Sequence, residues 1–140
     1  MTAISLLLVD DSPVFLSIAT RFLRAYDDLV VAGVAGGGQE ALAQARDLRP
    51  QVVVLDLRMP GLPGLEVIPL LRALLPQVGI VVLTLLGGNG YREAALAAGA
   101  DDFVAKAAMS TDLVPAIRRV AQLHRPGQSH ESRPISGGKP

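Results

Sequence analysis

Five polar residues of the sequence stand at the ends of short apolar runs. The run LLLV is followed by two adjacent carboxylates, and the runs VVVL, IVVL and DFVA are each followed by one polar residue. If these runs are parallel strands of one sheet, their carboxyl ends meet at one edge, where ligands bind in such sheets. The residues that would gather at this edge are Asp10, Asp11, Asp56, Thr84 and Lys106.

The three carboxylates of this group favour a divalent cation. Like charges a few ångströms apart raise each other's pKa or require a counter-cation. The chain has no cysteine and no clustered histidine, so the ligands are oxygen atoms, which suit Mg²⁺. Mg²⁺ usually completes its coordination with water and phosphate oxygens, so the predicted site is suited to a phosphoryl group.

Asp56 is the better candidate for a nucleophile, because its strand should lie in the centre of the sheet. An aspartate carboxylate can attack phosphorus to give an acyl phosphate, and this transfer depends on positioning and on neutralising the transferring oxygens. The Thr84 hydroxyl and the Lys106 ammonium can supply that neutralisation. Asp10 and Asp11 are better placed as metal ligands.

Short apolar runs, mostly Val, Ile and Leu and apolar on both faces, alternate with stretches of helical spacing. This alternation predicts five βα units in an open, doubly wound parallel sheet of flavodoxin-like order 2-1-3-4-5. Capping signals place the helix starts at Ser12-Pro13, Gly38, Gly64, Asn89 and Ser110 or Asp112, with Gly99 closing the fourth helix. The predicted strands are Ile4 to Val9, Leu29 to Ala35, Gln51 to Leu55, Gly79 to Leu83 and Asp102 to Ala105.

Composition narrows the function classes. The 140 residues are 50% hydrophobic, enough for one domain with one core, and Lys plus Arg equal Asp plus Glu at 13 each. A balanced charge argues against direct binding to nucleic acid or an anionic membrane. The N-terminal apolar stretch is too short for a membrane span and lacks a basic flank, so neither a signal peptide nor an anchor is expected, and the predicted location is cytoplasmic.

Two prolines fall inside stretches that are predicted to be helical. Pro69 and Pro115 fall about one turn inside the third and fifth predicted helices, so either those helices begin later or they kink.

Residues 124–140 are polar and rich in Pro, Gly and Ser, which predicts a disordered tail or linker after a domain of residues 1–123. His124 and His130 lack partners at metal-binding spacing and are expected to be solvated.

The motifs LLLVDDSPVF, VVVLDLRMPGLPGLEVI, IVVLT and GADDFVAK carry a resemblance in their order and spacing. Asp10 and Asp56 are separated by 46 positions, Thr84 follows after 28 more and Lys106 after another 22. Over about residues 3 to 123 the chain resembles the response regulator receiver domains of two-component signalling, including the single-domain chemotaxis receivers. Each motif alone is weak, but four in register are specific.

The resemblance implies a role for each matching residue. Asp56 would accept phosphate from a sensor histidine kinase or phosphotransfer protein, with Mg²⁺ held by Asp11, Asp56, the backbone carbonyl of Arg58 and, largely through water, Asp10. Thr84 and Lys106 would contact the phosphoryl oxygens. Phe103 would be an aromatic switch whose rotamer changes when Thr84 moves, and this change would rearrange the face formed by the fourth helix, fifth strand and fifth helix.

The resemblance also implies what the chain does as a whole. It would be a switch with self-directed phosphotransfer and autodephosphorylation rather than a turnover enzyme. Its output would pass to a partner protein, to an output domain or to a second copy through a phosphorylation-dependent homodimer.

The chain also departs from the family pattern. Leu85 follows Thr84 where the family usually has a small residue, so slower phosphoryl entry or hydrolysis is expected. Ala107 stands where many receivers have proline, and the ending AKAAMSTDL is more similar to receivers attached to helix-turn-helix domains. The glycine-rich loop at residues 87–90 is predicted to be mobile.

Two alternatives remain open. The chain could be the receiver half of a helix-turn-helix transcriptional regulator whose output domain lies outside it. A flavodoxin-like binder or a Mg²⁺-dependent phosphohydrolase is less supported. A flavin phosphate needs hydrogen-bond donors after the first strand, where this chain has acids, and the second acid of an aspartyl phosphohydrolase is absent after Asp56.

Overall fold

A computed structural model describes residues 2–85 and 89–124, and gives only the backbone of Asn89. Its five strands are all parallel and lie in the order β2-β1-β3-β4-β5, which confirms the predicted topology. Two strand ends were wrong by one residue, because Gln51 lies outside β3 and Thr84 is the last residue of β4 rather than the residue after it. The strands are β1 Ile4–Val9, β2 Leu29–Ala35, β3 Val52–Leu55, β4 Gly79–Thr84 and β5 Asp102–Ala105.

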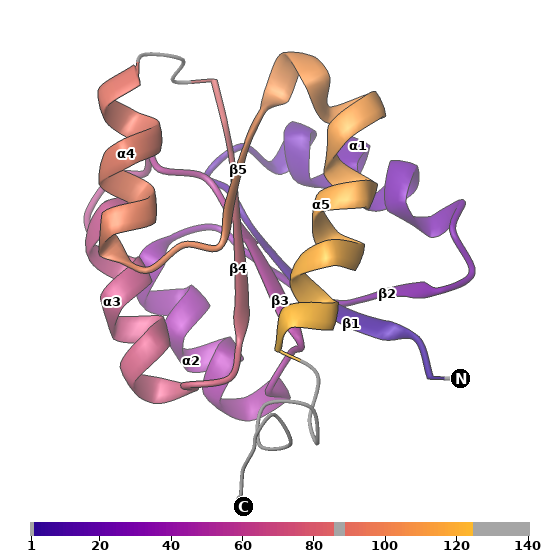
Figure 1. The fold of residues 1–140 in the computed structure, drawn as a ribbon, viewed down its shortest axis with the longest axis horizontal. Helices are drawn as coiled ribbons and strands as arrows, with labels where there is room; N and C mark the ends of the chain where they lie inside the picture. Colours follow the sequence, from indigo (N-terminus) through magenta and orange to yellow (C-terminus); the bar gives the residue numbers. More distant parts are fainter. Residues whose placement is uncertain (1, 86–88, 125–140) are drawn as a thin grey trace, which may run out of the picture.

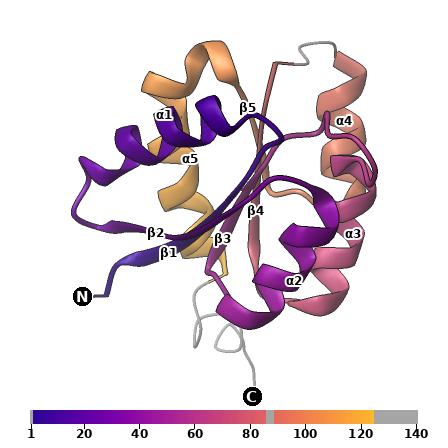
Figure 2. The same cartoon turned by 180° about the vertical axis from the view of Figure 1, so that it is seen from behind.

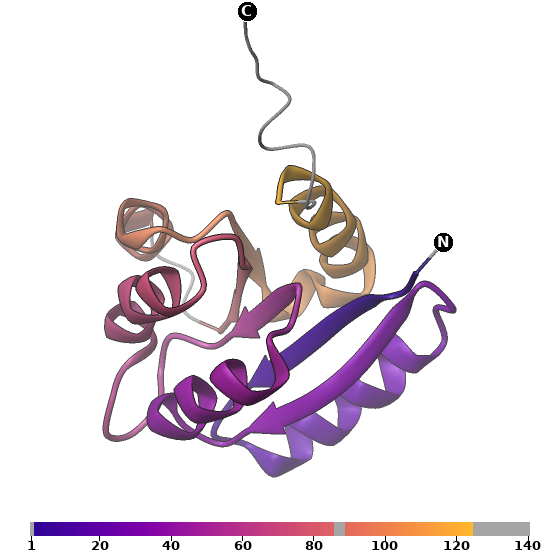
Figure 3. The same ribbon diagram turned by 90° about the horizontal axis from the view of Figure 1, so that it is seen from below.

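Helices cover both faces of the sheet. In Figures 1 and 2 the sheet stands between two layers of helices, with α1 and α5 on one side and α2, α3 and α4 on the other, and Figure 3 shows the molecule from below. Among the described residues, no helix is long and apolar enough to cross a bilayer. The helices are α1 Pro13–Arg24, α2 Gly38–Leu48, α3 Gly64–Leu74, α4 Asn89–Ala98 and α5 Met109–Leu123, with a short 3₁₀ turn, η1 Lys106–Ala108, before α5.

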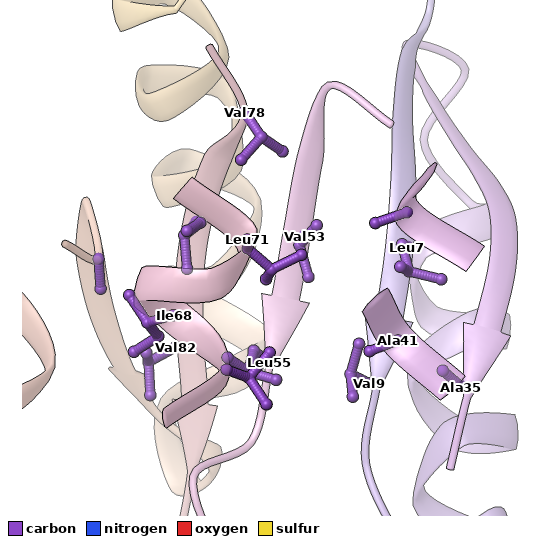
Figure 4. Packing of buried hydrophobic residues seen from close by; sticks show 14 of the residues in the cluster. Leu7, Val9, Ala35, Ala41, Val53, Leu55, Ile68, Leu71, Val78 and Val82 are labelled. Atoms are coloured by element: carbon purple, nitrogen blue, oxygen red, sulfur yellow. The ribbon is translucent and has the colours of Figure 1, made fainter. Parts of the chain in front are cut away.

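The alternation of side chains along each strand divides the core into two clusters. In β1, Leu6 and Leu8 pack toward α1 and α5, whereas Leu7 and Val9 pack toward the other helices. Figure 4 shows the second cluster, in which Ile68 and Leu71 of α3 lie against β3 and β4. The edge strand β2 is less covered than expected: Val30 and Val34 are 48% and 41% exposed, because side chains of an edge strand have a neighbouring strand on one side only.

Most helix boundaries agree with the capping signals. Ser12 caps α1 by accepting a hydrogen bond from the Phe15 amide at 3.1 Å, and Gly99 ends α4 with a positive φ of 121°. The start predicted for the fifth helix was wrong by one residue for Ser110 and by three for Asp112, because η1 leads directly into α5 at Met109.

The two prolines lie inside their helices, so a later helix start is wrong for both. Pro69 and Pro115 are both exposed. Each proline frees the carbonyl four residues earlier, and at an exposed position water can satisfy that carbonyl. The predicted tail from residue 125 and residues 86–88 of the predicted mobile loop lie outside the described residues.

At the sheet edge where the strands begin, Asp101 joins three elements. Its Oδ2 accepts hydrogen bonds from the Ile80 amide at 2.8 Å and from Arg72 of α3 at 3.1 Å. Its Oδ1 lies 2.9 Å from Nε2 of His124, directly after α5. The expectation that His124 is solvated was therefore wrong, while His130 lies outside the described residues.

Candidate functional site

The sheet register brings two carboxylates together where β1 and β3 end. Val9 is paired with Leu55, and the ladder continues one step further through a hydrogen bond from the Asp56 amide to the Val9 carbonyl at 3.0 Å. Asp10 and Asp56 therefore follow neighbouring strands side by side, and both are buried, with 2% and 6% of their surface exposed. This is the upper edge in Figure 1, where the chain passes from β5 to α5; the N-terminus lies at the opposite edge.

Lys106 reaches this carboxylate pair from the end of β5. Its Nζ lies 2.6 Å from Oδ2 of Asp10 and 3.3 Å from Oδ2 of Asp56, and its side chain is only 11% exposed. Burial lowers the pKa of Lys106, but the hydrogen bond to Asp10 and the charges of Asp56 and Asp10 outweigh it, so the net direction is upward. The lysine is therefore a firmly charged ammonium between two acids.

Asp10 is the member of the pair whose charged form is disfavoured by its surroundings. Burial raises the pKa of Asp10, and the nearby charge of Asp56 adds to this, while Lys106 and the Ser12 amide oppose it without cancelling it. The Ser12 amide donates to Oδ1 of Asp10 at 2.9 Å. Oδ2 of Asp10 is contacted by the Lys106 ammonium at 2.6 Å. The buried Asp10 carboxylate therefore keeps a raised pKa in spite of this close cation.

A third carboxylate, the exposed Asp11, completes a cluster that fits a hard divalent cation. Asp10, Asp11 and Asp56 each offer one oxygen, and these three atoms lie within 4.8 Å of one another. Mg²⁺ prefers such hard oxygen ligands, and these three carboxylates could hold it together with water and a phosphate oxygen. Three carboxylates against one ammonium leave two negative charges, which a divalent cation would balance.

The remaining predicted residues differ in where they lie relative to this cluster. Thr84 is buried at the end of β4 and is paired with Ala105, the residue before Lys106. Arg58 is exposed, and its amide donates a long hydrogen bond of 3.4 Å to Oδ1 of Asp56. Phe103 is partly buried against the cluster of core residues under α2, α3 and α4, and β4 lies between its strand and β3, after which Asp56 stands.

One contact of the site was not predicted from the sequence. Nζ of Lys106 lies 4.0 Å from the centroid of the Phe15 ring, in the first turn of α1. The sequence marks Phe15 only as an apolar residue at helical spacing, four positions after Asp11. The signal that could have found it is the combination of a firmly placed helix cap at Ser12 with an aromatic side chain three residues later.

Comparisons with known proteins agree on one family. Residues 6–118 match the model of the response regulator receiver domain. The chain is 38% identical over 117 residues to the response regulator GacA of Pseudomonas viridiflava, which covers 84% of the chain and 55% of that protein. It is 38% identical over 124 residues to the probable transcriptional regulatory protein TcrX of Mycobacterium tuberculosis, covering 89% of the chain and 51% of that protein. The chain thus spans about half the length of the curated relatives that it matches.

Solved structures support the same assignment. The signal receiver domain of the putative response regulator NarL from Mycobacterium tuberculosis superposes with a TM-score of 0.82 at 28% identity, covering 87% of this chain and 98% of that one. The response regulator domain of Thermotoga maritima CheB gives a TM-score of 0.80 at 27% identity, covering 86% of this chain and 97% of that one. The family match, the strand order and the relatives all agree, and the chain belongs to the response regulator receiver domains of two-component systems.

Proposed function

We propose that Asp56 is the phosphoryl acceptor of this receiver and that its phosphorylation depends on Mg²⁺. The observation that carries the proposal is the buried pair of Asp10 and Asp56 bridged by the Lys106 ammonium, with Asp11 beside it at the strand ends. This arrangement offers a nucleophile, a fixed cation and a cluster of hard oxygen ligands in one place. The phosphoryl donor is the phosphohistidine of a sensor histidine kinase or of a phosphotransfer protein.

In the proposed reaction, an oxygen of the Asp56 carboxylate attacks phosphorus while the P–N bond of the donor breaks, and the electron pair of that bond stays with the imidazole. The product is an acyl phosphate on Asp56 and a free histidine on the donor. Mg²⁺, when bound, neutralises charge on the phosphoryl oxygens, and Asp10, Asp11, Asp56 and the Arg58 carbonyl would hold it. Lys106 turns from Asp10 and Asp56 to one phosphoryl oxygen, and the Thr84 hydroxyl donates to another. Water later hydrolyses the acyl phosphate, so the chain also dephosphorylates itself.

The signal leaves through the face formed by α4, β5 and α5. A phosphoryl group adds roughly −1.5 to −2 charges and three strong acceptors, which attract Thr84 at the end of β4. Because Thr84 is buried beside β5, its movement frees space toward which Phe103 can turn. The changed face then binds an output protein, an output domain or a second copy of the chain.

The length of the relatives bears on the output. Since the chain spans about half of relatives that include a protein named as a transcriptional regulator, a helix-turn-helix output domain in a longer protein is the alternative to a stand-alone receiver. The balanced charge argues against direct binding of nucleic acid by this chain. The absence of cysteine from the sequence suits a reducing compartment, and we place the chain in the cytoplasm.

Incubation with acetyl phosphate and MgCl₂, followed by intact mass measurement, tests the proposed function. Acetyl phosphate replaces the kinase as donor, so the reaction reports on the chain's own residues. We expect one phosphoryl adduct per chain, suppressed when EDTA removes the metal. An unmodified chain at every time point, with folding confirmed by circular dichroism, would contradict the proposal.

Asp11→Asn is expected to weaken Mg²⁺ binding without unfolding the chain, because Asp11 is exposed. At a Mg²⁺ concentration 100 times the dissociation constant, binding adds about 2.7 kcal/mol to the free energy of unfolding. Thermal unfolding with and without MgCl₂ measures this gain, and Asp11→Asn should remove most of it. Asp47→Asn, at an exposed acid of α2, is the matched control and should keep the full gain. An equal gain in Asp11→Asn and the unchanged chain would exclude Asp11 as a ligand.

Leu85→Ala is expected to speed both phosphorylation by acetyl phosphate and loss of the adduct. Leu85 directly follows Thr84, the last residue of β4, and its side chain is 78% exposed and so lies outside the core. Truncation therefore opens access for donor and water at little cost in stability. The adduct lifetime, followed by mass after removal of the donor, should shorten several-fold. A lifetime equal to that of the unchanged chain would show that Leu85 does not shield the site.

A further inference from the structure

The ammonium of Lys106 is enclosed by two different kinds of partner. On one side lie the carboxylates of Asp10 and Asp56, at 2.6 and 3.3 Å from Nζ. On the other lies the ring of Phe15, whose centroid is 4.0 Å from Nζ. An aromatic face attracts a cation through the ring quadrupole, and the attraction is strongest where water is excluded, as it is around a side chain that is 11% exposed.

The first turn of α1 fixes the position of this ring. Asp10 accepts a hydrogen bond from the Ser12 amide at 2.9 Å, and the Ser12 hydroxyl accepts one from the Phe15 amide at 3.1 Å. These two bonds run from the carboxylate that pairs with Lys106 to the residue whose ring covers Lys106. The contacts thus form a closed circuit of four residues, Asp10, Ser12, Phe15 and Lys106.

We propose that Phe15 is a positioning residue that keeps the Lys106 ammonium at the site when a metal ion occupies the carboxylates. The inference rests on the proposed function. A divalent cation held by Asp10 and Asp56 would compete with Lys106 for these carboxylates, and its charge would repel the ammonium. The ring face carries no net charge and is not a ligand for Mg²⁺, so it still attracts the ammonium in the loaded site. Lys106 then remains beside Asp56, ready to pair with the incoming phosphoryl oxygens, instead of turning out to solvent.

Phosphorylation kinetics with acetyl phosphate and saturating MgCl₂ test this role. Phe15→Leu keeps an apolar side chain but removes the ring, and we expect a maximal rate roughly 5- to 30-fold lower. Phe15→Tyr keeps the ring face and should restore most of the rate. Phe22→Leu is the matched control, because Phe22 lies on the same helix, packs against the same core cluster and has its ring against Tyr26. Trifluorophenylalanine at position 15 fills almost the same volume with a weak ring face, and should be slow like Phe15→Leu.

A double-mutant cycle separates positioning from simple packing. In a Lys106→Met background, Phe15→Leu should cause no further loss of phosphorylation rate, because Phe15 acts through the Lys106 ammonium, which is absent there. An equal loss with and without Lys106, or a rate that does not fall in the fluorinated chain, would overturn the proposal. A chain that is never phosphorylated would instead contradict the proposed function, and the next measurement needs no phosphorylation.

Nuclear magnetic resonance reads the contact directly. Protons over the face of an aromatic ring are shielded, so the ε-methylene signal of Lys106 should lie upfield of the signals of freely solvated lysines. The shift should persist when MgCl₂ is added, vanish in Phe15→Leu and remain in Phe22→Leu. Collapse of the shift in the unchanged chain on addition of MgCl₂ would show that the ring does not hold the ammonium, and would overturn the inference whatever the kinetics.

Discussion

Asp56→Asn is expected to abolish the phosphoryl adduct that acetyl phosphate forms with the chain. An amide has no carboxylate oxygen that can attack phosphorus, and the substitution also removes one of the three oxygen ligands grouped for a divalent ion. Asparagine has nearly the same shape as aspartate, so the tight packing at the end of β3 is kept. Intact mass measurement under conditions that fully modify the unchanged chain gives the readout.

Stability provides the control for this variant. The charge of Asp56 is one of the causes that raise the pKa of Asp10, so Asp56→Asn relieves a repulsion between two buried acids. The free energy of unfolding without metal should therefore stay equal to that of the unchanged chain or rise. Asp47→Asn, on the exposed face of α2, should be phosphorylated normally. A folded Asp56→Asn chain that still gains the adduct would assign the acceptor to another residue.

Gly64→Ala is expected to cause the largest loss of stability among single substitutions near the site. A Cβ atom at Gly64 would lie 2.4 Å from the Asp56 carbonyl oxygen and 2.6 Å from Cα of Leu57. Both neighbours are backbone atoms, and the Gly64 amide is already tied to the Leu57 carbonyl by a hydrogen bond of 2.9 Å. Overpacking against backbone should cost about 3 kcal/mol and lower the midpoint of thermal unfolding by roughly 10 °C. The shift of the Asp56 backbone should also slow phosphorylation in the folded fraction.

The matched control is Gly90→Ala in the first turn of α4, where a Cβ atom meets nothing within 4 Å. Alanine is favoured over glycine in a helix by roughly 0.5 to 1 kcal/mol, so this variant should be as stable as the unchanged chain or slightly more so. Equal unfolding midpoints for Gly64→Ala and Gly90→Ala would show that α3 can move away from the strand end. The close approach of the two backbones would then be unimportant for the site.

Most of the fold could be predicted from the sequence because its local signals agree with one another. The strands β1, β2 and β5 have the predicted bounds, and the helix starts at Pro13, Gly38, Gly64 and Asn89 follow from caps or glycine. The start of α5 was less clear, because η1 inserts a tighter turn between Lys106 and Met109 that no capping residue marks. The later helix starts suggested by Pro69 and Pro115 were wrong for a related reason. The cost of a proline in a helix depends on whether the freed carbonyl can reach water, and sequence alone does not give exposure.

The candidate site could be predicted in part. The sequence orders the polar strand ends, and parallel strands necessarily bring Asp10, Asp11 and Asp56 to one edge. It does not give the side-chain path of Lys106, which extends from the end of β5 back to the end of β1 to pair with Asp10. Nor does it reveal that the Phe15 ring covers that ammonium, because this contact joins the first turn of α1 to a residue 91 positions away in the chain.

The central claim is that Asp56 carries the phosphoryl group, and its most direct test is chemical mapping of the adduct. Borohydride reduces an aspartyl phosphate to homoserine, so the modified position is recorded permanently and can be read by peptide sequencing in a mass spectrometer. After incubation with acetyl phosphate and MgCl₂, we expect homoserine at position 56 and unchanged aspartate at positions 10 and 11. Homoserine at position 10 or 11, or a phosphoryl group that resists borohydride, would contradict the proposed acceptor.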